Sequence, residues 1–168
     1  MRITKKLHRE DHEAGFTLIE LLIVMSVMLI LMTLAVPELL HLRKTANEAS
    51  AQASVKAIAE AELDYNKNYG TFTCTLSALG GDHNAGPPTP LAAQILPVDL
   101  ATGNKSGYTF AITNCDKTTI NNEDRFNSFE VTAVPQSVGH TGDRGFCGDE
   151  TNIRYDPAGG VNCTQAIK

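Results

Sequence analysis

The chain has 168 residues, a formal net charge of −5, four cysteines and no tryptophan. That length has room for one membrane-scale helix and one modest globular domain. The small negative charge excludes the strongly basic composition with which proteins hold nucleic acid or anionic lipid, so no specific nucleic-acid partner is expected.

A charged segment, residues 1–15, precedes a 21-residue apolar run from Phe16 to Val36. At about 1.5 Å per residue, a helix of this length crosses the roughly 30 Å hydrocarbon core of a bilayer. Basic residues ahead of an apolar helix keep the N-terminus in the cytoplasm and send the C-terminal part outward. The run is longer than the apolar region of a signal peptide, and no convincing A-x-A site follows it. An uncleaved signal anchor is an alternative interpretation.

One carboxylate, Glu20, interrupts the apolar run near its start. A charge inside a membrane segment is costly and usually has a functional partner. The simpler alternative is a glutamate that reaches back to the lipid headgroups. Glu20 therefore raises the question of which group neutralises it.

The sequence Gly-Phe-Thr-Leu-Ile-Glu at residues 15–20, followed by an apolar helix with Pro37 near its end, resembles the N-terminus of type IV pilins and pseudopilins. The resemblance implies that a prepilin peptidase cuts after Gly15 on the cytoplasmic side. It also implies that the same enzyme methylates the new N-terminus, Phe16. The resemblance at the level of residues covers only the N-terminal part of the chain.

Elementary electrostatics leads to a related expectation. Cleavage after Gly15 would create an ammonium group at Phe16, one helical turn from Glu20. A carboxylate removed from water needs a paired charge, and in a helical stack that charge can come from a neighbouring subunit. A misaligned subunit would leave the charge unpaired in lipid, so we expect Glu20 and Phe16 to set the register of assembly.

The resemblance implies a non-enzymatic structural subunit of a type IV pilus or of a pseudopilus like that of type II secretion. Such a subunit is first a single-pass protein of the bacterial inner membrane and then part of a periplasmic or extracellular filament. The implied partners are prepilin peptidase, the inner-membrane assembly platform, membrane lipid before assembly, and other pilin subunits in a homopolymer. Two alternatives stay open, a membrane-anchored exported binding domain and a minor or tip pilin.

Beyond the apolar run, Pro37 removes a helix hydrogen bond and should kink or loosen the helix. Helical spacing resumes at once and continues to about Asn68, with Gly70 as the C-cap. One narrow face of this second half would let another helix approach closely; it consists of Ala46, Ala49, Ala53, Ala57, Ala61 and Tyr65. A second apolar face should pack on the chain's own domain; it contains Val55, Ile58, Ala59 and Leu63.

The remainder predicts a small antiparallel sheet laid against the outer half of the helix, an α+β fold that also resembles the pilin head. Short helical turns are expected at 76–80 and 91–100, strands at 107–113 and 128–134, a polar turn at 114–127, and a closing hairpin at 144–147 and 152–155. The expected divisions are a cleaved leader (1–15), a membrane and assembly half of the helix (16–36), an amphipathic half (37–69) and a globular head (70–168).

All four cysteines lie beyond the apolar helix, and none forms a C-x-x-C pair, which argues against a zinc site. Two disulfides in an exported domain are the better interpretation. Four cysteines allow three pairings. We favour Cys147–Cys163, which closes a short C-terminal loop, and Cys74–Cys115, which ties the loop after the helix to the first strand.

Motifs of common enzymes are absent from the sequence: it contains no G-x-S-x-G, no H-E-x-x-H and no P-loop. No catalytic residue, metal ligand or cofactor site is predicted. The glycine-rich stretch 139–145 is interpreted as a turn. Calcium binding, as in some pseudopilins, is one alternative for four acidic residues of the C-terminal loops, but solvated loop charges are the favoured interpretation of Asp143, Asp149, Glu150 and Asp156.

Overall fold

The computed structural model describes residues 15–167, so all of the expected leader except Gly15 lies outside the described residues. The chain divides into two compact units, with the boundary between Leu39 and Leu40. One helix, α1 (Leu18–Tyr69), runs through that boundary.

The bounds of α1 differ slightly from those expected. The helix begins at Leu18 rather than Phe16, because Thr17 serves as its N-cap, and it ends at Tyr69 rather than Asn68. Gly70 follows with a positive φ of 70°, the left-handed conformation that ends many helices. The finer division of the chain at residues 16, 37 and 70 stays a prediction.

In the first unit, α1 presents its apolar side chains to the outside. It is long and apolar enough to cross a membrane, and none of its apolar window is buried within the described chain. Its two hydroxyl side chains between Leu21 and Leu39 bond to carbonyls of their own helix, Ser26 to Ile23 and Thr33 to Ile30. An exposed apolar surface of this extent marks a membrane or protein interface.

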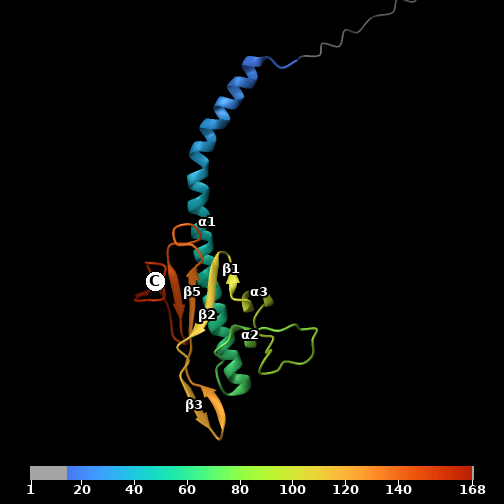
Figure 1. Cartoon of the computed structure of the whole chain (residues 1–168), viewed down its shortest axis with the longest axis vertical. Helices are drawn as coiled ribbons and strands as arrows, with labels where there is room; N and C mark the ends of the chain where they lie inside the picture. The colour runs from blue at the N-terminus through green and yellow to red at the C-terminus, as the bar shows by residue number, and fades with distance from the viewer. Residues whose placement is uncertain (1–14, 168) are drawn as a thin grey trace, which may run out of the picture. The chain divides into compact units, whose positions relative to one another are not determined.

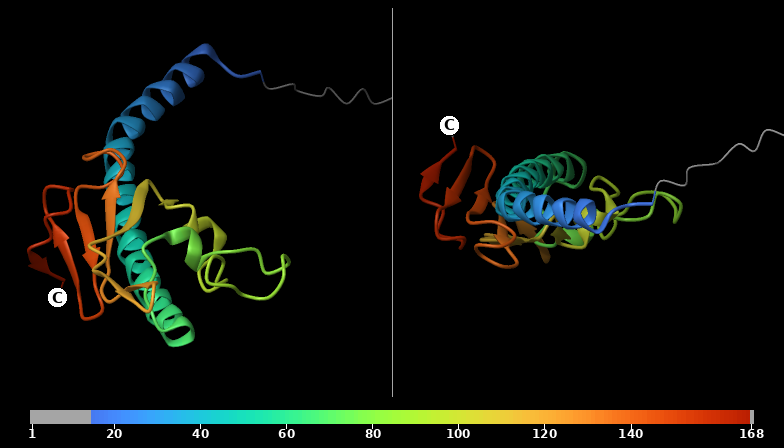
Figure 2. Two further views of the ribbon diagram at one scale, coloured as in Figure 1. Left: turned by 60° about the horizontal axis from the view of Figure 1, so that its bottom comes forward. Right: turned by 90° about the horizontal axis from the view of Figure 1, so that it is seen from above.

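The second unit is a six-stranded antiparallel sheet against the second half of α1, with strand order β1-β2-β5-β6-β7-β8 (Figures 1 and 2). A separate two-stranded sheet pairs β3 with β4. The predicted α+β, pilin-like class is confirmed. The short helices are α2 (Leu76–Leu79) and α3 (Val98–Ala101), and the strands are β1 (Asn104–Lys105), β2 (Tyr108–Thr113), β3 (Lys117–Ile120), β4 (Glu123–Phe126), β5 (Glu130–Pro135), β6 (Gly145–Gly148), β7 (Ile153–Asp156) and β8 (Gln165–Ala166).

The core of the second unit lies between α1 and the inner face of the sheet. Alternate residues of β2 are buried, as the period of two along a strand requires. Burying one large apolar side chain contributes about 1.5–3 kcal/mol, so this layer is the main source of the unit's stability. The buried layer includes Ala51, Val55 and Ile58 of α1 and Tyr108, Phe110, Val131, Ala133 and Phe146 of the sheet.

The alanine face expected on α1 is divided by the fold, so that prediction was wrong in part. Ala61 and Tyr65 are buried in the core, whereas Ala46, Ala49 and Ala53 are exposed. The helix turns by 100° per residue, so a stripe with steps of three and four drifts around its surface as it lengthens. Only the first part of the stripe is available to another helix.

The expected polar turn at 114–127 is wrong, because this segment folds into the hairpin β3–β4. Its turn residues, Asn121 and Asn122, have φ values of 53° and 66°. Two successive positive φ values are the signature of the type I′ turn, which asparagine tolerates well. The hairpin escaped prediction because β3 is exposed throughout and therefore lacks alternating burial.

The expected helix at 91–100 is also largely wrong. Residues 91–97 are irregular, and α3 begins only after Pro97. Proline fixes its φ in a helix-compatible value and has no N–H to leave without a partner, so helices often begin just after it. The Leu79 carbonyl accepts hydrogen bonds from the N–H groups of Ile95 and Leu96, both at 2.9 Å, which ties this irregular segment to the end of α2.

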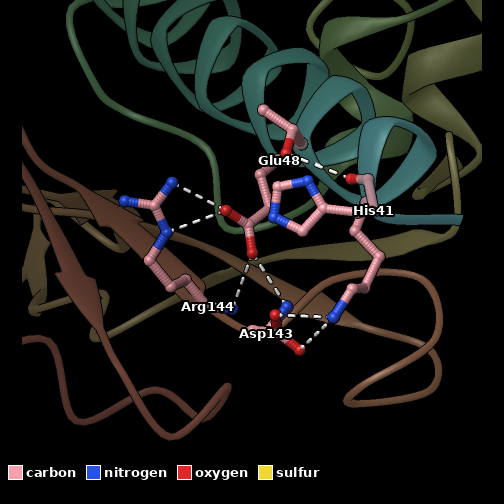
Figure 3. Close-up of a pocket in the computed structure, with 6 residues that line it drawn as sticks. His41, Glu48, Asp143 and Arg144 are labelled. Carbon is pink, nitrogen blue, oxygen red and sulfur yellow. Dashed lines mark hydrogen bonds and ion pairs between the residues drawn. The ribbon is translucent and has the colours of Figure 1, made fainter. Parts of the chain in front are cut away.

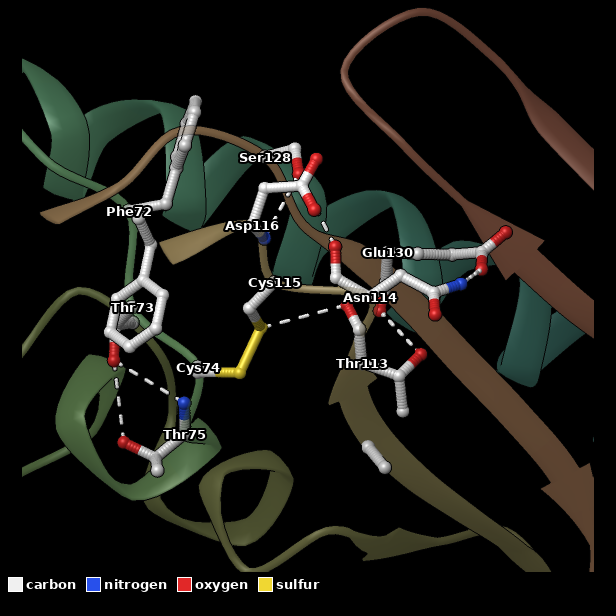
Figure 4. The surroundings of a disulfide bond; sticks show 12 residues. Phe72, Thr73, Cys74, Thr75, Thr113, Asn114, Cys115, Asp116, Ser128 and Glu130 are labelled. Atoms are coloured by element: carbon white, nitrogen blue, oxygen red, sulfur yellow. Dashed lines mark hydrogen bonds between the residues drawn. A yellow bond between two sulfur atoms is a disulfide. The ribbon is translucent and has the colours of Figure 1, made fainter. Parts of the chain in front are cut away.

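Two disulfides staple the second unit. Cys74–Cys115 joins the loop after α1 to the end of β2 (Figure 4). Cys147–Cys163 joins β6 to the segment that leads into β8. These are the two pairs that we favoured from the sequence. Each bridge restricts the unfolded chain and typically contributes about 2–4 kcal/mol to stability.

The close approach of α1 to β6 generates a prediction. A Cβ atom at Gly148 would lie 2.5 Å from Cγ1 of Val55. Gly148→Ala should therefore lower the free energy of unfolding by about 1–3 kcal/mol, because a packed core resists added volume. The measurement is denaturant unfolding of the full chain in detergent.

The matched control is the same substitution in a Val55→Ala background, where the clashing methyl group is gone. Gly148→Ala should lower the free energy of unfolding by less in that background, since the stability effects of substitutions at contacting residues are not additive. Equal costs in the two backgrounds would contradict the packing of α1 against β6.

Candidate functional site

The first turn of α1 is closed by reciprocal hydrogen bonds between Thr17 and Glu20. The N–H and hydroxyl of Thr17 both donate to Glu20 Oε2, at 2.9 and 2.7 Å. The N–H of Glu20 donates in return to Thr17 Oγ1 at 3.3 Å. This arrangement is a capping box, which supplies partners for amides that the start of a helix leaves open. The Thr-x-x-Glu spacing at residues 17–20 is the sequence signal of a capping box, which we did not predict from the sequence.

Gly15 and Phe16 precede the helix and are exposed. Phe16 is 88% exposed. A Cβ atom at Gly15 would meet nothing within 4 Å among the described residues. Among the described residues, no contact restricts the size of a side chain at this position.

A family model described as the prokaryotic N-terminal methylation motif matches residues 11–36. The chain carries the prepilin signal of type IV pilins and pseudopilins. The match contains Gly15, Phe16 and Glu20 together with most of the apolar half of α1. No curated protein sequence matches the chain. The prepilin signal ends before the second unit, so the match carries no information about the role of that unit.

Pro37 directly follows the prepilin signal and lies inside α1. Its ring nitrogen carries no hydrogen, so one helix hydrogen bond is missing where the apolar run ends. The helix is nevertheless continuous through this position. The loosening of the helix that we expected at Pro37 stays a prediction.

Glu48, one of two buried glutamates on α1, anchors the loop before β6. Its Oε1 accepts hydrogen bonds from the N–H groups of Asp143 and Arg144, at 2.8 and 3.2 Å. Its Oε2 accepts two more from the Arg144 guanidinium, from Nε at 2.8 Å and from Nη2 at 2.6 Å. A carboxylate with both oxygens occupied and a cation beside it can be buried at little cost.

A pocket of about 330 Å³ lies beside this ion pair, with His41 and Lys44 among its lining residues (Figure 3). Lys44 Nζ pairs with Asp143 Oδ2 at 2.9 Å. Glu48 is neutralised by Arg144, so the charges in the pocket cancel in pairs. The pocket therefore offers no surplus charge that would hold an anion or a metal ion, and we interpret it as a clamp between α1 and the loop.

Of the acidic loop residues considered for calcium, Asp149 and Asp156 each have partners of their own. Asp149 pairs with Arg154 and accepts hydrogen bonds from its own turn, and Asp156 accepts from the N–H groups of Ala158 and Asn162. Within residues 15–167, no group of three or more His, Cys, Asp or Glu side chains is placed to hold a metal ion.

Glu62, near the end of α1, is the second buried glutamate. Its side chain is 0% exposed, Oε2 accepts the N–H of Thr73 at 2.9 Å, and Oε1 has no hydrogen-bond partner within the described residues. Burial disfavours the charged form and raises the pKa of Glu62 to about 7, although the Thr73 hydrogen bond opposes this shift. The carboxyl group is therefore largely protonated in mildly acidic solution.

The buried Glu62 predicts a stability that depends on pH. The folded pKa of about 7 lies above the ordinary glutamate value of 4.5, so the folded state binds the extra proton. The stabilisation is complete below pH 4.5 and is lost as the pH rises to 7. We expect the wild type to lose on the order of 2–3 kcal/mol between pH 5 and pH 8 in denaturant unfolding.

Glu62→Gln, which mimics the neutral acid, should remove most of that loss. Glu60→Gln is the matched control, because Glu60 is exposed on the same helix and should leave the pH profile unchanged. A wild-type profile in the Glu62→Gln variant would contradict the account.

Proposed function

We propose that this protein is a structural subunit of a type IV pilus or of a pseudopilus like that of type II secretion. The observation that carries the proposal is an apolar helix that is exposed along its length and begins with the prepilin signal. Such a surface needs a lipid or protein environment. A subunit that resides in a membrane and then packs in a filament provides both in turn.

Processing at the junction between Gly15 and Phe16 is the first step of the proposed role. Prepilin peptidase cuts there on the cytoplasmic side and methylates Phe16. The prepilin signal at residues 11–36, which contains this junction, supports this step. The chemistry is carried out on the chain, and the chain itself acts as a structural protein.

Assembly is the second step. The new ammonium group of Phe16 pairs with Glu20 of an adjacent subunit, and so sets the register of the helices in the filament. A buried carboxylate without a partner is strongly unfavourable, so only aligned subunits pack stably. The exposed alanines of α1, at positions 46, 49 and 53, let neighbouring helices approach closely above the membrane segment.

The second unit becomes the surface of the filament in this proposal. Before assembly it lies outside the inner membrane, with α1 as the single span and the N-terminus in the cytoplasm. Its two disulfides support export, because disulfides persist in oxidising compartments such as the bacterial periplasm. The assembly platform in the inner membrane then moves the subunit from lipid into the growing filament.

The cleavage site generates one prediction. Gly15→Leu should leave unprocessed precursor in the membrane, since a bulky side chain blocks the enzyme, whereas Gly15→Ala adds one methyl group and should retain more cleavage. Mass spectrometry of the membrane-bound chain distinguishes the two forms by the mass of residues 1–15. Cleavage of the leucine variant at the wild-type level would rule out Gly15 as the recognised residue.

The contact between Glu20 and Phe16 generates a second prediction about assembly. Glu20→Ala should leave cleavage intact but lower the yield of sheared filaments roughly tenfold or more, because the ammonium group loses its charged partner. Glu20→Gln should behave in the same way, since it keeps a hydrogen-bond acceptor but no charge. Ser26→Ala is the control in the same helix, with an expected yield equal to that of the wild type. Normal filaments from both Glu20 variants would refute the proposed pairing.

A further inference from the structure

The loop between β5 and β6, residues 136–144, lies beside α1 at the end of the sheet where that helix enters the second unit (Figures 1 and 2, orange). Two side-chain contacts hold the loop there. Lys44 Nζ pairs with Asp143 Oδ2 at 2.9 Å, and Asn47 Nδ2 donates to the Thr141 carbonyl at 2.9 Å. The loop is therefore fixed close to the start of the second unit's part of α1.

A second loop, residues 157–160 after β7, lies at the same end of the sheet. The strands β6 and β7 are antiparallel, with Gly145 opposite Asp156, so the end of β7 lies beside the start of β6. The two loops touch, because a Cβ atom at Gly159 would lie 2.9 Å from Cγ2 of Val138. Together the two loops form one surface, which we call the entry rim.

The entry rim is apolar and carries no net charge. Val138 is 56% exposed, and Pro157 and Ala158 are also exposed. The charged residues of the two loops are one acid and one base, Asp143 and Arg144, which sum to zero when histidine is counted as neutral. The rim can therefore approach an apolar or headgroup layer without burying a surplus charge.

The opposite end of the sheet has a different character. It consists of residues 114–128, between β2 and β5, and residues 149–152, between β6 and β7. These two segments contain five acidic and two basic residues, a net charge of −3. Lipid phosphates would repel this end. The distribution of charge therefore favours the entry rim as the face of the second unit that meets lipid.

We propose that the entry rim contacts the surface of the lipid bilayer while α1 spans the membrane. The proposal rests on the part of the proposed function in which α1 crosses the inner membrane before assembly. Lipid is the occupant because the exposed apolar surface of α1 continues into the second unit through Leu40 and Leu42, which are 56% and 57% exposed. Leu42 lies two residues before Lys44, a rise of about 3 Å along the helix. The rim thus begins where the apolar surface of the helix ends.

The physical basis is burial of apolar side chains in the interfacial layer of the bilayer. This layer is about 5–8 Å thick on each side, the difference between the whole bilayer and its hydrocarbon core. Each exposed apolar side chain of the rim that leaves water contributes favourably in proportion to its buried area. Clusters of basic residues bind membranes through anionic lipids instead. Because the rim has no net charge, its contact should not depend on anionic lipid.

The chain contains no tryptophan, so a single introduced tryptophan reports on one position. Val138→Trp places the probe on the entry rim. Ile120→Trp is the matched control, because Ile120 is 52% exposed and lies in β3 at the opposite end of the sheet. Denaturant unfolding verifies that both variants are folded. The full-length variants are placed in phosphatidylcholine vesicles whose acyl chains carry bromine near the headgroup end.

Bromine should reduce the fluorescence of Val138→Trp by about half, since a tryptophan at the headgroup level lies within reach of the quencher. The fluorescence of Ile120→Trp should be the same with and without bromine. Addition of phosphatidylglycerol should leave both results unchanged. Equal quenching at the two positions would overturn the inference, and so would quenching at position 138 that requires phosphatidylglycerol.

Tryptophan itself prefers the membrane interface, so a second measurement uses the wild type. Lipids with a photoreactive diazirine at the headgroup end should label peptides from residues 136–144 and leave residues 117–126 unlabelled, as mass spectrometry would detect. Equal labelling of the two segments would overturn the inference. A chain that floats with vesicles but fails these tests keeps its membrane anchor, whereas a chain that does not float with vesicles would contradict the proposed function.

Discussion

A carboxylate in the first turn of an apolar helix has to be hydrogen-bonded or paired before hydrocarbon or packed protein can surround it. Glu20 meets this constraint in part within its own chain, through the two donors of Thr17. We propose that the ammonium group of Phe16 from another subunit supplies the charged partner in the filament. On this proposal Glu20 limits the free-energy cost of a single subunit in lipid, and its pairing in the filament lowers the free energy further.

The helix α1 also carries two buried glutamates, and each is accommodated differently. Glu48 is neutralised by Arg144 and by two backbone N–H groups of the loop before β6. Glu62 has one hydrogen bond, and burial raises its pKa to about 7. The contacts of Glu48 and Glu62 join α1 to two loops of the second unit, the loop before β6 and the loop after α1.

The prepilin signal, the apolar helix and the α+β class were predictable from the sequence, because each depends on local spacing. A 21-residue apolar run needs no tertiary context to be recognised, and alternation along β2 reports one buried face. The buried roles of Glu48 and Glu62 were not predictable, since each depends on a partner supplied by a distant loop. The hairpin β3–β4 was missed for a related reason, because an exposed strand carries no hydrophobic pattern.

The central claim is that Glu20 of one subunit meets Phe16 of another, and solid-state NMR of a mixed filament tests it most directly. Half of the subunits would carry ¹⁵N at the Phe16 amine and the other half ¹³C in the Glu20 carboxyl group, so that any dipolar coupling between the labels arises between molecules. The account predicts a coupling that corresponds to an ion pair, with nitrogen and oxygen within about 4 Å. A well-ordered mixed filament without that coupling would contradict it.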